Sequence, residues 1–151
     1  MRDEDFKKMV DNILIHYPLF YRKIKTSAID AKRLKYGKSD GYYQILGILS
    51  DSGPLPISKV GKQLYISKPN MTPLIDKLVE DGFVIRSRDE KDRRIVNVRI
   101  TKEGKKFLWD ARGVVEENIK ENLKNLDEND LNTMNDSLEN IRKLTLKINH
   151  K

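Results

Sequence analysis

The sequence predicts a mainly α-helical protein that carries one small β-hairpin. Apolar residues recur at helical spacing towards both ends of the chain and in its middle. Between residues 83 and 101 the pattern changes to two short β-type runs, with Val84 and Ile85 before a charged tip and Val96 and Val98 after it. Nine residues at and beside the tip hold five cations, which are Arg86, Arg88, Lys91, Arg93 and Arg94. A ribbon with arginines on a projecting tip is suited to a nucleic-acid groove.

The first helix is expected over residues 5–17, where apolar residues are separated by one or three positions, and it is interrupted at Pro18. A proline at this position ends, kinks or restarts the helix. A second helical stretch, rich in lysine and arginine, covers residues 19–34, and residues 35–41 form a turn-rich break. Residues 42–49 are expected to form a short, strongly apolar helix, and residues 51–56, with two prolines, a loop.

Two short helices then follow each other closely, as in a helix-turn-helix. The first covers residues 57–64, with Val60 and Leu64 facing inward. Ser67 is a suitable N-cap for the second, whose expected buried residues are Met71, Ile75, Leu78 and Val79. Gly82 is placed to close this helix as a C′ glycine.

Two residues depart from what is usual in this arrangement. Tyr65 stands in the turn where a glycine is common, and Pro73 lies deeper in the second helix than proline normally tolerates. Pro69 fits the first helical turn. We therefore expect Pro73 to distort the helix locally, either widening its start or setting its angle in a groove.

The C-terminal third of the chain is expected to form two long helices. One begins at residues 101–104 and extends to about residue 126, and the other is capped by Asp127 and carries apolar residues at steps of three or four up to Ile148. A pair of long helices cannot bury both apolar faces alone, so self-association is the natural solution. The predicted organisation is a dimerisation region at residues 1–36, a winged helix-turn-helix at residues 37–104 and C-terminal dimerisation helices at residues 105–151.

Composition and charge exclude several classes of protein. The 151 residues include no cysteine, which excludes disulfides and thiolate metal sites. No apolar run approaches the roughly 18 residues of a membrane span, and the N-terminus does not resemble a signal peptide, so we expect a soluble, cytoplasmic protein without a membrane partner. Residues 57–106 contain 13 Lys and Arg against 7 Asp and Glu, whereas residues 107–140 contain 3 against 9. The positive charge is therefore concentrated around the predicted helix-turn-helix and wing.

The predicted DNA-binding residues lie on these two features. The second helix of a helix-turn-helix enters the major groove, and its first residues face base edges and phosphates. Asn forms hydrogen bonds with adenine, and Lys forms them with guanine or a phosphate. Ser and Thr form hydrogen bonds with bases or phosphates. For Ser67 alone, a plain capping role is as good an explanation. The full set is Lys62, Gln63, Ser67, Lys68, Asn70, Thr72 and Lys77 on the helices, and Arg86, Arg88, Lys91, Asp92, Arg93 and Arg94 on the wing.

Several motifs in this region resemble the MarR family of transcriptional regulators. Residues 64–78 are LYISKPNMTPLIDKL, residues 81–84 are DGFV, residues 89–94 are DEKDRR and residues 100–104 are ITKEG. The resemblance covers about residues 42–108 and implies a homodimer whose terminal helices interlock while two winged domains bind a pseudopalindromic operator on double-stranded DNA. It also implies that Asp92 braces the wing and that Arg94 enters the minor groove. Without that context, the two would form an ordinary surface ion pair.

The resemblance further implies a repressor that a small anionic aromatic effector releases from DNA. The cleft between the dimerisation helices and the winged domain would hold the effector, although a packing or dimer-interface role is the better explanation for each candidate. These candidates are His16, Tyr17, Tyr21, Arg22, Tyr36 and Tyr43. No cofactor is expected, and a zinc site is unsupported because the chain has only two well-separated histidines, His16 and His150.

Three alternatives compete with specific DNA binding. A winged helix can be a protein-interaction module without specific DNA binding, but such a module has no need of a basic wing. RNA binding through the same ribbon is disfavoured because no aromatic residues are interleaved with the basic ones to stack unpaired bases. An enzyme is disfavoured because the sequence contains no nucleophile–His–acid set and no Gly-rich phosphate loop.

Overall fold

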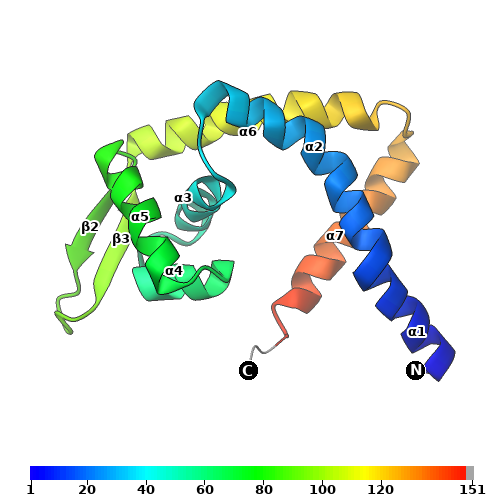
Figure 1. The fold of residues 1–151 in the computed structure, drawn as a ribbon, viewed down its shortest axis with the longest axis horizontal. Helices are drawn as coiled ribbons and strands as arrows, with labels where there is room; N and C mark the ends of the chain where they lie inside the picture. The colour runs from blue at the N-terminus through cyan, green and yellow to red at the C-terminus, as the bar shows by residue number, and fades with distance from the viewer. Residues whose placement is uncertain (149–151) are drawn as a thin grey trace.

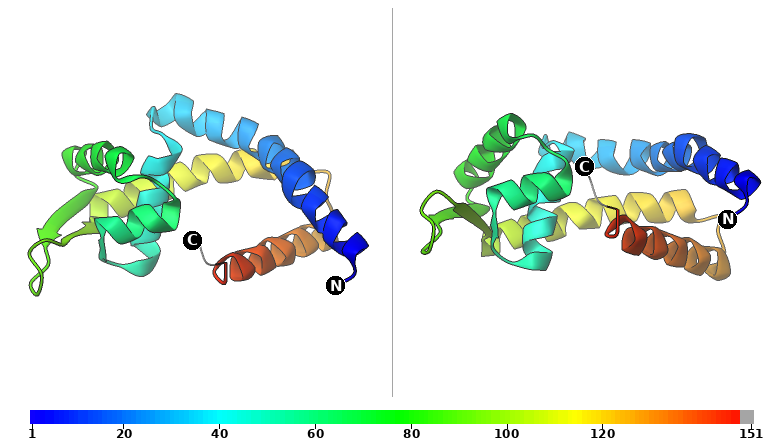
Figure 2. Two further views of the ribbon diagram at one scale, coloured as in Figure 1. Left: turned by 60° about the horizontal axis from the view of Figure 1, so that its bottom comes forward. Right: turned by 90° about the horizontal axis from the view of Figure 1, so that it is seen from below.

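The chain folds into a wing-bearing unit and an arm of long helices. The computed structural model describes residues 1–148, and it describes side chains throughout that range except at residues 26–34. The wing-bearing unit lies at the left of Figure 1, whereas the N-terminal helices and the last helix extend from its other side. Helix α6 (Lys102–Leu123) connects the two regions and lies against α2 (Tyr17–Tyr36), as the views of Figure 2 also show.

The N-terminal helical segments form one continuous path. Helix α1 (Asp3–Asp11) passes through a π-helical turn, η1 (Asn12–His16), directly into α2. In this wide turn the N–H of Tyr17 donates to the carbonyl of Asn12, five residues earlier. A proline lacks an N–H and its ring collides with the carbonyl four residues before it, so a wider turn ahead of Pro18 lets the helical path continue. Pro18 therefore does not end the helix, which continues past it through the π turn.

Three helices build the centre of the wing-bearing unit. They are α3 (Asp40–Ser52), α4 (Ile57–Leu64) and α5 (Lys68–Glu80). Helix α3 begins earlier than predicted, with Ser39 at its N-cap position, so the break after α2 is confined to residues 37–39. Gly37 has φ +64°, a left-handed conformation that glycine adopts without strain. Helices α4 and α5 follow the prediction.

The sheet has three strands rather than the two of the predicted hairpin. Strands β2 (Val84–Arg88) and β3 (Val96–Ile100) pair antiparallel, with Val84 opposite Ile100. The segment predicted as a loop over residues 51–56 contains β1 (Leu55–Pro56), which pairs with β3 on its other edge. A two-residue strand that includes a proline has no local β pattern, and proline is tolerated here because β1 is an edge strand.

The core lies between α3, α4, α5, the sheet and the start of α6. Its buried side chains include Tyr42, Ile45, Leu46, Leu49, Val60, Met71, Ile75, Leu78, Val84, Val98, Ile100 and Leu108. The prediction that Val79 is buried was wrong, because the residue is 37% exposed. Val79 lies at the edge of the stripe formed by Met71, Ile75 and Leu78, one residue before the end of α5 at Glu80.

One junction holds α6 against the end of α5 and the start of β2. Helix α5 closes as a full Schellman motif, in which Gly82 at φ +78° donates to Val79 and Phe83 donates to Leu78. Thr101 caps α6 by accepting from the N–H of Gly104 at 3.0 Å, and its hydroxyl donates to the carbonyl of Gly82 at 2.7 Å. The N-terminus of α6 is thus fixed to the C-terminus of α5.

The last helix, α7 (Glu128–Thr145), begins with a capping box. Asp127 accepts from the N–H of Asp130 at 2.8 Å, and the Asp130 carboxylate accepts from the N–H of Asp127 at 3.3 Å. Within the described residues, no helix is both long and apolar enough to cross a membrane.

Candidate nucleic-acid interface

The turn between α4 and α5 is closed by a tyrosine in a left-handed conformation. Tyr65 has φ 54° and ψ 37°, and the N–H of Ile66 donates to the carbonyl of Gly61 at 2.9 Å. A Cβ added to Gly61 would lie 3.1 Å from both the Ile66 carbonyl and Met71 Cγ, so this glycine permits the close approach of the two helices. Tyr65 therefore adopts the left-handed conformation at the turn position where a glycine is common, and the turn between the two helices still forms.

The predicted DNA-binding residues of the two helices are exposed at the end of α4 and along α5. Ser67 occupies the N-cap position of α5 with extended backbone angles, but its side chain makes no capping hydrogen bond. Helix α5 is continuous through Pro73. Thr72 Oγ1 donates to the carbonyl of Lys68 at 3.3 Å. The exposed residues are Lys62, Gln63, Ser67, Lys68, Asn70 and Thr72.

Few backbone donors remain at the N-terminus of α5. The N–H groups of Asn70 and Met71 both donate to the carbonyl of Ser67, at 3.0 and 2.9 Å. Pro69 has no N–H. Of the first-turn amides, this leaves the N–H of Lys68 to face a phosphate, so the helix terminus contributes less to anion binding than an ordinary first turn would.

The wing tip is ordered by Asp89, which the sequence analysis did not include among the site residues. Its Oδ1 accepts from the N–H groups of Lys91 and Asp92 at 2.9 and 3.0 Å, and its Oδ2 accepts from Asn97 Nδ2 at 3.1 Å. The backbone hydrogen bonds first, and then the Asn97 amide, hold the pKa of the Asp89 carboxyl below its ordinary value. An aspartate that caps the backbone two residues onward is a known turn device, so this role was available from the sequence.

Asp92 and Arg94 form a two-pronged ion pair at the tip. Nε and Nη2 of Arg94 each lie 3.1 Å from an oxygen of Asp92, which also accepts the backbone N–H of Arg94 at 3.1 Å. The guanidinium lowers the pKa of the Asp92 carboxyl. The Arg94 side chain is 91% exposed. The pair thus holds a guanidinium in one orientation while leaving it open to solvent.

The other predicted cations differ in how far they are neutralised. Arg86 of β2 forms an ion pair with Asp76 of α5, and Lys77 lies 3.5 and 3.6 Å from carboxylate oxygens of Glu80 and Asp81. Arg88 donates to the carbonyl of Arg93 at 3.0 Å. Within the part of the chain that the structure describes, five of the predicted cations form no ion pair with a carboxylate, and these are Lys62, Lys68, Arg88, Lys91 and Arg93.

The geometry is that of a winged helix-turn-helix, and residues 39–96 match the model of the MarR family. Residues 39–96 form a MarR-family domain.

The curated proteins similar to this chain are named HTH-type transcriptional regulators. It is 29% identical over 103 residues to the uncharacterized HTH-type transcriptional regulator YkoM of Bacillus subtilis, a match that covers 66% of each chain. It is 34% identical over 71 residues to the HTH-type transcriptional regulator SarZ of Staphylococcus epidermidis, covering 47% of this chain and 48% of SarZ. The chain thus spans between about half and two thirds of the length of these relatives.

Solved structures of the family share the fold over nearly the whole chain. The transcriptional regulator BldR from Sulfolobus solfataricus superimposes with a TM-score of 0.75 at 26% identity, covering 98% of this chain and 100% of BldR. A mutant MarR from E. coli in complex with operator DNA gives a TM-score of 0.66 at 18% identity, covering 87% and 96%, and this likeness concerns the fold alone.

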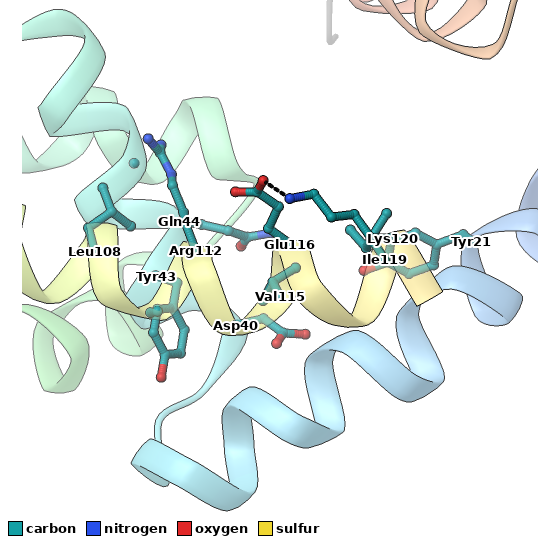
Figure 3. Close-up of a pocket in the computed structure, with 12 residues that line it drawn as sticks. Tyr21, Asp40, Tyr43, Gln44, Leu108, Arg112, Val115, Glu116, Ile119 and Lys120 are labelled. Carbon is teal, nitrogen blue, oxygen red and sulfur yellow. Dashed lines mark ion pairs between the residues drawn. The ribbon is translucent and has the colours of Figure 1, made fainter. Parts of the chain in front are cut away.

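Of the predicted effector residues, the structure brings two to one pocket of the MarR-family fold. Tyr21 of α2 and Tyr43 of α3 line a cavity of about 520 Å³ against α6, shown in Figure 3. Burial, followed by the neighbouring Tyr36 and Asp40, raises the pKa of the Tyr43 hydroxyl to about 12. Tyr36 lines a separate pocket beside Trp109. The remaining three candidates line neither of these pockets and are exposed on the N-terminal helices, and they are His16, Tyr17 and Arg22.

The same pocket contains charged residues that the sequence analysis missed. Arg112 of α6 lines it and forms no ion pair with the described residues, whereas Lys120 is paired with Glu116 at 2.7 Å. Arg112 had no signal in the sequence, because only the packing of α6 against α3 brings it there. Among the described residues no group of three His, Cys, Asp or Glu is placed to hold a metal ion, and His150 lies outside the described residues.

A second unpredicted cluster lies at the end of the recognition helix α5. The carboxylate of Asp81 accepts from the hydroxyl of buried Tyr42 at 2.5 Å and from Lys38 Nζ at 2.7 Å. Burial acts to raise the pKa of Asp81, but these hydrogen bonds outweigh it and keep the pKa below its ordinary value. The cluster fastens the segment between α2 and α3 to the C-terminal end of α5.

Proposed function

We propose that this protein is a homodimeric transcriptional regulator that binds a pseudopalindromic DNA operator and acts by binding rather than catalysis. The observation that carries the proposal is the wing tip, where Asp89 orders the backbone and Asp92 orients a 91% exposed Arg94. Family relatives are named transcriptional regulators, and one MarR structure holds operator DNA. A protein-docking module would have no use for such an ordered and open guanidinium.

The contacts divide between the two elements of the interface. Lys68, Asn70 and Thr72 are exposed near the start of α5, and this exposure supports their contact with base edges in the major groove. The exposure of Arg94 at the tip supports its entry into the minor groove, whose negative potential attracts a guanidinium. The remaining cations serve the phosphates, with Ser67 and Gln63 beside them, and they are Lys62, Lys77, Arg86, Arg88, Lys91 and Arg93.

Homodimer formation is supported by apolar side chains left open on the terminal helices. Within the described residues, the exposed ones on the N-terminal path are Phe6, Met9, Ile13, Leu14, Ile15, Tyr17, Leu19 and Tyr21, and those towards the C-terminus are Leu131, Leu138, Ile141, Leu144, Leu146 and Ile148. So large an apolar surface on two neighbouring arms is characteristic of an interaction site. A second copy would cover it while setting two winged units side by side.

The test removes the guanidinium at the tip without disturbing the fold. An operator is first obtained by selecting bound fragments from random DNA, and affinity is then measured by gel shift at physiological salt. We expect Arg94→Ala to weaken binding by about 5- to 150-fold, which corresponds to roughly 1–3 kcal/mol for a specific groove contact. The matched control is Arg2→Ala, because Arg2 is also exposed and paired with a nearby carboxylate, Asp5, but lies at the far end of the molecule.

Two results would count against the proposal. One is an Arg94→Ala protein that is folded, dimeric and undiminished in affinity. The other is an operator affinity that does not change with salt concentration, because each phosphate contact contributes about −0.9 to the slope of log affinity against log salt concentration.

The finer proposal is that the protein is a repressor released by a small anionic aromatic compound. The pocket between α2, α3 and α6 supports it, because Tyr21 and Tyr43 supply aromatic surface and Arg112 a cation outside any ion pair with the described residues. We expect benzoate to lower operator affinity in the parent protein and to have a much smaller effect in Arg112→Gln. Equal release of both proteins by benzoate would exclude Arg112 as the anion contact.

A further inference from the structure

The outward face of the recognition helix α5 begins with two prolines. Pro69 and Pro73 are four residues apart, so they lie on the same side of the helix, and both are exposed. This side is opposite the buried stripe of Met71, Ile75 and Leu78. In a helix-turn-helix the outward face is the one that enters the groove. The centre of the predicted DNA-facing surface is therefore formed by two pyrrolidine rings rather than by polar side chains.

This part of the helix has little capacity to donate hydrogen bonds. Neither proline has a backbone N–H. Thr72, beside Pro73, donates its hydroxyl to the carbonyl of Lys68 at 3.3 Å, so its hydrogen is used within the helix and its methyl group remains for contact. Pro69, Thr72 and Pro73 together form an apolar ridge, with Lys68 and Asn70 as the polar groups near it.

The acidic residues farther along α5 limit how much of the helix can approach DNA. Glu80 is exposed on the same side as the prolines, and Asp76 is held there in an ion pair with Arg86. Carboxylates are repelled by the phosphates that line a groove. Close contact with the base edges is therefore confined to the first two turns, where the apolar ridge lies.

We propose that Pro69 and Pro73 determine specificity by packing against the C5-methyl groups of thymines in the major groove. The inference rests on the proposed function, because it concerns the same DNA-binding surface. Thymine is the only base that presents an apolar group in the major groove, whereas the others present donors or acceptors that a proline ring cannot satisfy. Burying such a polar edge against proline would leave it without a partner.

The spacing of the two rings predicts the spacing of the thymines. Four helical residues rise about 6 Å along the axis, at roughly 1.5 Å each. Successive base pairs are about 3.4 Å apart. Each half-site should therefore carry two thymine methyls about two base pairs apart, with Asn70 beside them in a position to bond an adenine.

The experiment replaces thymine by deoxyuridine, one position at a time, in the operator selected from random DNA. This substitution removes one methyl group and leaves base pairing unchanged. Loss of a buried methyl at about 0.8 kcal/mol corresponds to roughly fourfold weaker binding at each of the two positions. Thymines outside the half-sites serve as the internal control, and deoxyuridine there should leave affinity unchanged.

Variants then connect each methyl group to a residue. Pro73→Ala and Pro69→Ala suit helical geometry, because alanine is the strongest helix former, so these proteins remain folded. We expect the fourfold penalty of deoxyuridine at one position to shrink in Pro73→Ala, and at the other position in Pro69→Ala. Gln63→Ala is a matched control on the neighbouring helix, and it should retain both penalties.

The outcomes separate this inference from the proposed function. If the protein binds its selected operator but deoxyuridine has no effect at any half-site thymine, the proline contacts are refuted and DNA recognition stands. If deoxyuridine weakens operator binding by both proline variants as much as by the parent protein, another residue contacts the thymine methyls and the inference is also refuted. If no operator is selected and binding is absent, both fail together.

Discussion

Replacement of Gly104 by alanine should destabilise the protein, although alanine is the better helix former. Gly104 is the third residue of α6, and a Cβ built there would lie 2.3 Å from the carbonyl oxygen of Phe83 and 2.8 Å from Ile100 Cγ1. The first of these atoms is backbone and is already fixed by the N–H of Thr101 at 2.9 Å. The methyl group therefore cannot be accommodated by a side-chain rotation.

The magnitude follows from two opposing terms. Overpacking in a well-packed region costs about 1–3 kcal/mol, and a clash with backbone belongs at the upper end. The helix propensity of alanine offsets this by at most about 1 kcal/mol. The net loss of about 2 kcal/mol should lower Tm by roughly 4–8 °C, at about 2–4 °C for each kcal/mol in a chain of this size.

Gly113→Ala provides the matched control in the same helix. A Cβ at Gly113 would meet nothing within 4 Å, so only the propensity gain of about 1 kcal/mol remains and Tm should rise by roughly 2–4 °C. Thermal unfolding followed by circular dichroism, at one protein concentration, measures both. If Gly104→Ala raises Tm as Gly113→Ala does, the close approach of α6 to Phe83 is not a constraint and the reasoning is refuted.

Three further predictions concern the turn, the core and the wing. Tyr65→Gly should raise the free energy of unfolding by about 1 kcal/mol, because the left-handed position costs a side chain roughly 1–2 kcal/mol, and urea unfolding will show whether it does. Tyr42→Phe should lower it by about 1.5–3 kcal/mol by removing a hydrogen bond to the charged Asp81, and an unchanged urea midpoint would contradict that role. The Asp89 pKa is depressed, so its contribution to stability is present above the ordinary value of 3.8 and is lost as pH falls through the folded pKa. Amide NMR shifts of Lys91 should then move below pH 3.8 in the parent protein and not in Asp89→Asn.

Most of the fold follows from local patterns in the sequence. Helical periodicity, the glycine at residue 82 and the cap at Asp127 depend on neighbours within a few positions, and the structure contains the elements that they predict. The family motifs identified the same central region that the family model matches. Local patterns could not predict β1. A strand of two residues has no alternating pattern, and it forms only by pairing with β3, which is distant in the sequence.

The parts of the site that escaped prediction depend on contacts across the fold. Asp81 and Tyr42 are separated by 39 positions, and Arg112 reaches the pocket only through the packing of α6 on α3. Asp89 differs, because its turn is local and its role was visible in principle. Val79 was misplaced because helical spacing puts it at the edge of the buried stripe, and spacing alone does not show where the core stops covering the end of α5.

The ion pairs within the interface have a consequence for how the protein would find its operator in a chromosome. Asp76, Asp92 and the acids beside Lys77 neutralise part of the positive field before DNA arrives. Fewer released counterions mean weaker retention on arbitrary sequences, which outnumber operators by about 10⁶–10⁹ in a genome. On the proposed function, a larger fraction of the molecules would then stay free to occupy the operators, and fewer copies per cell would be needed to fill them.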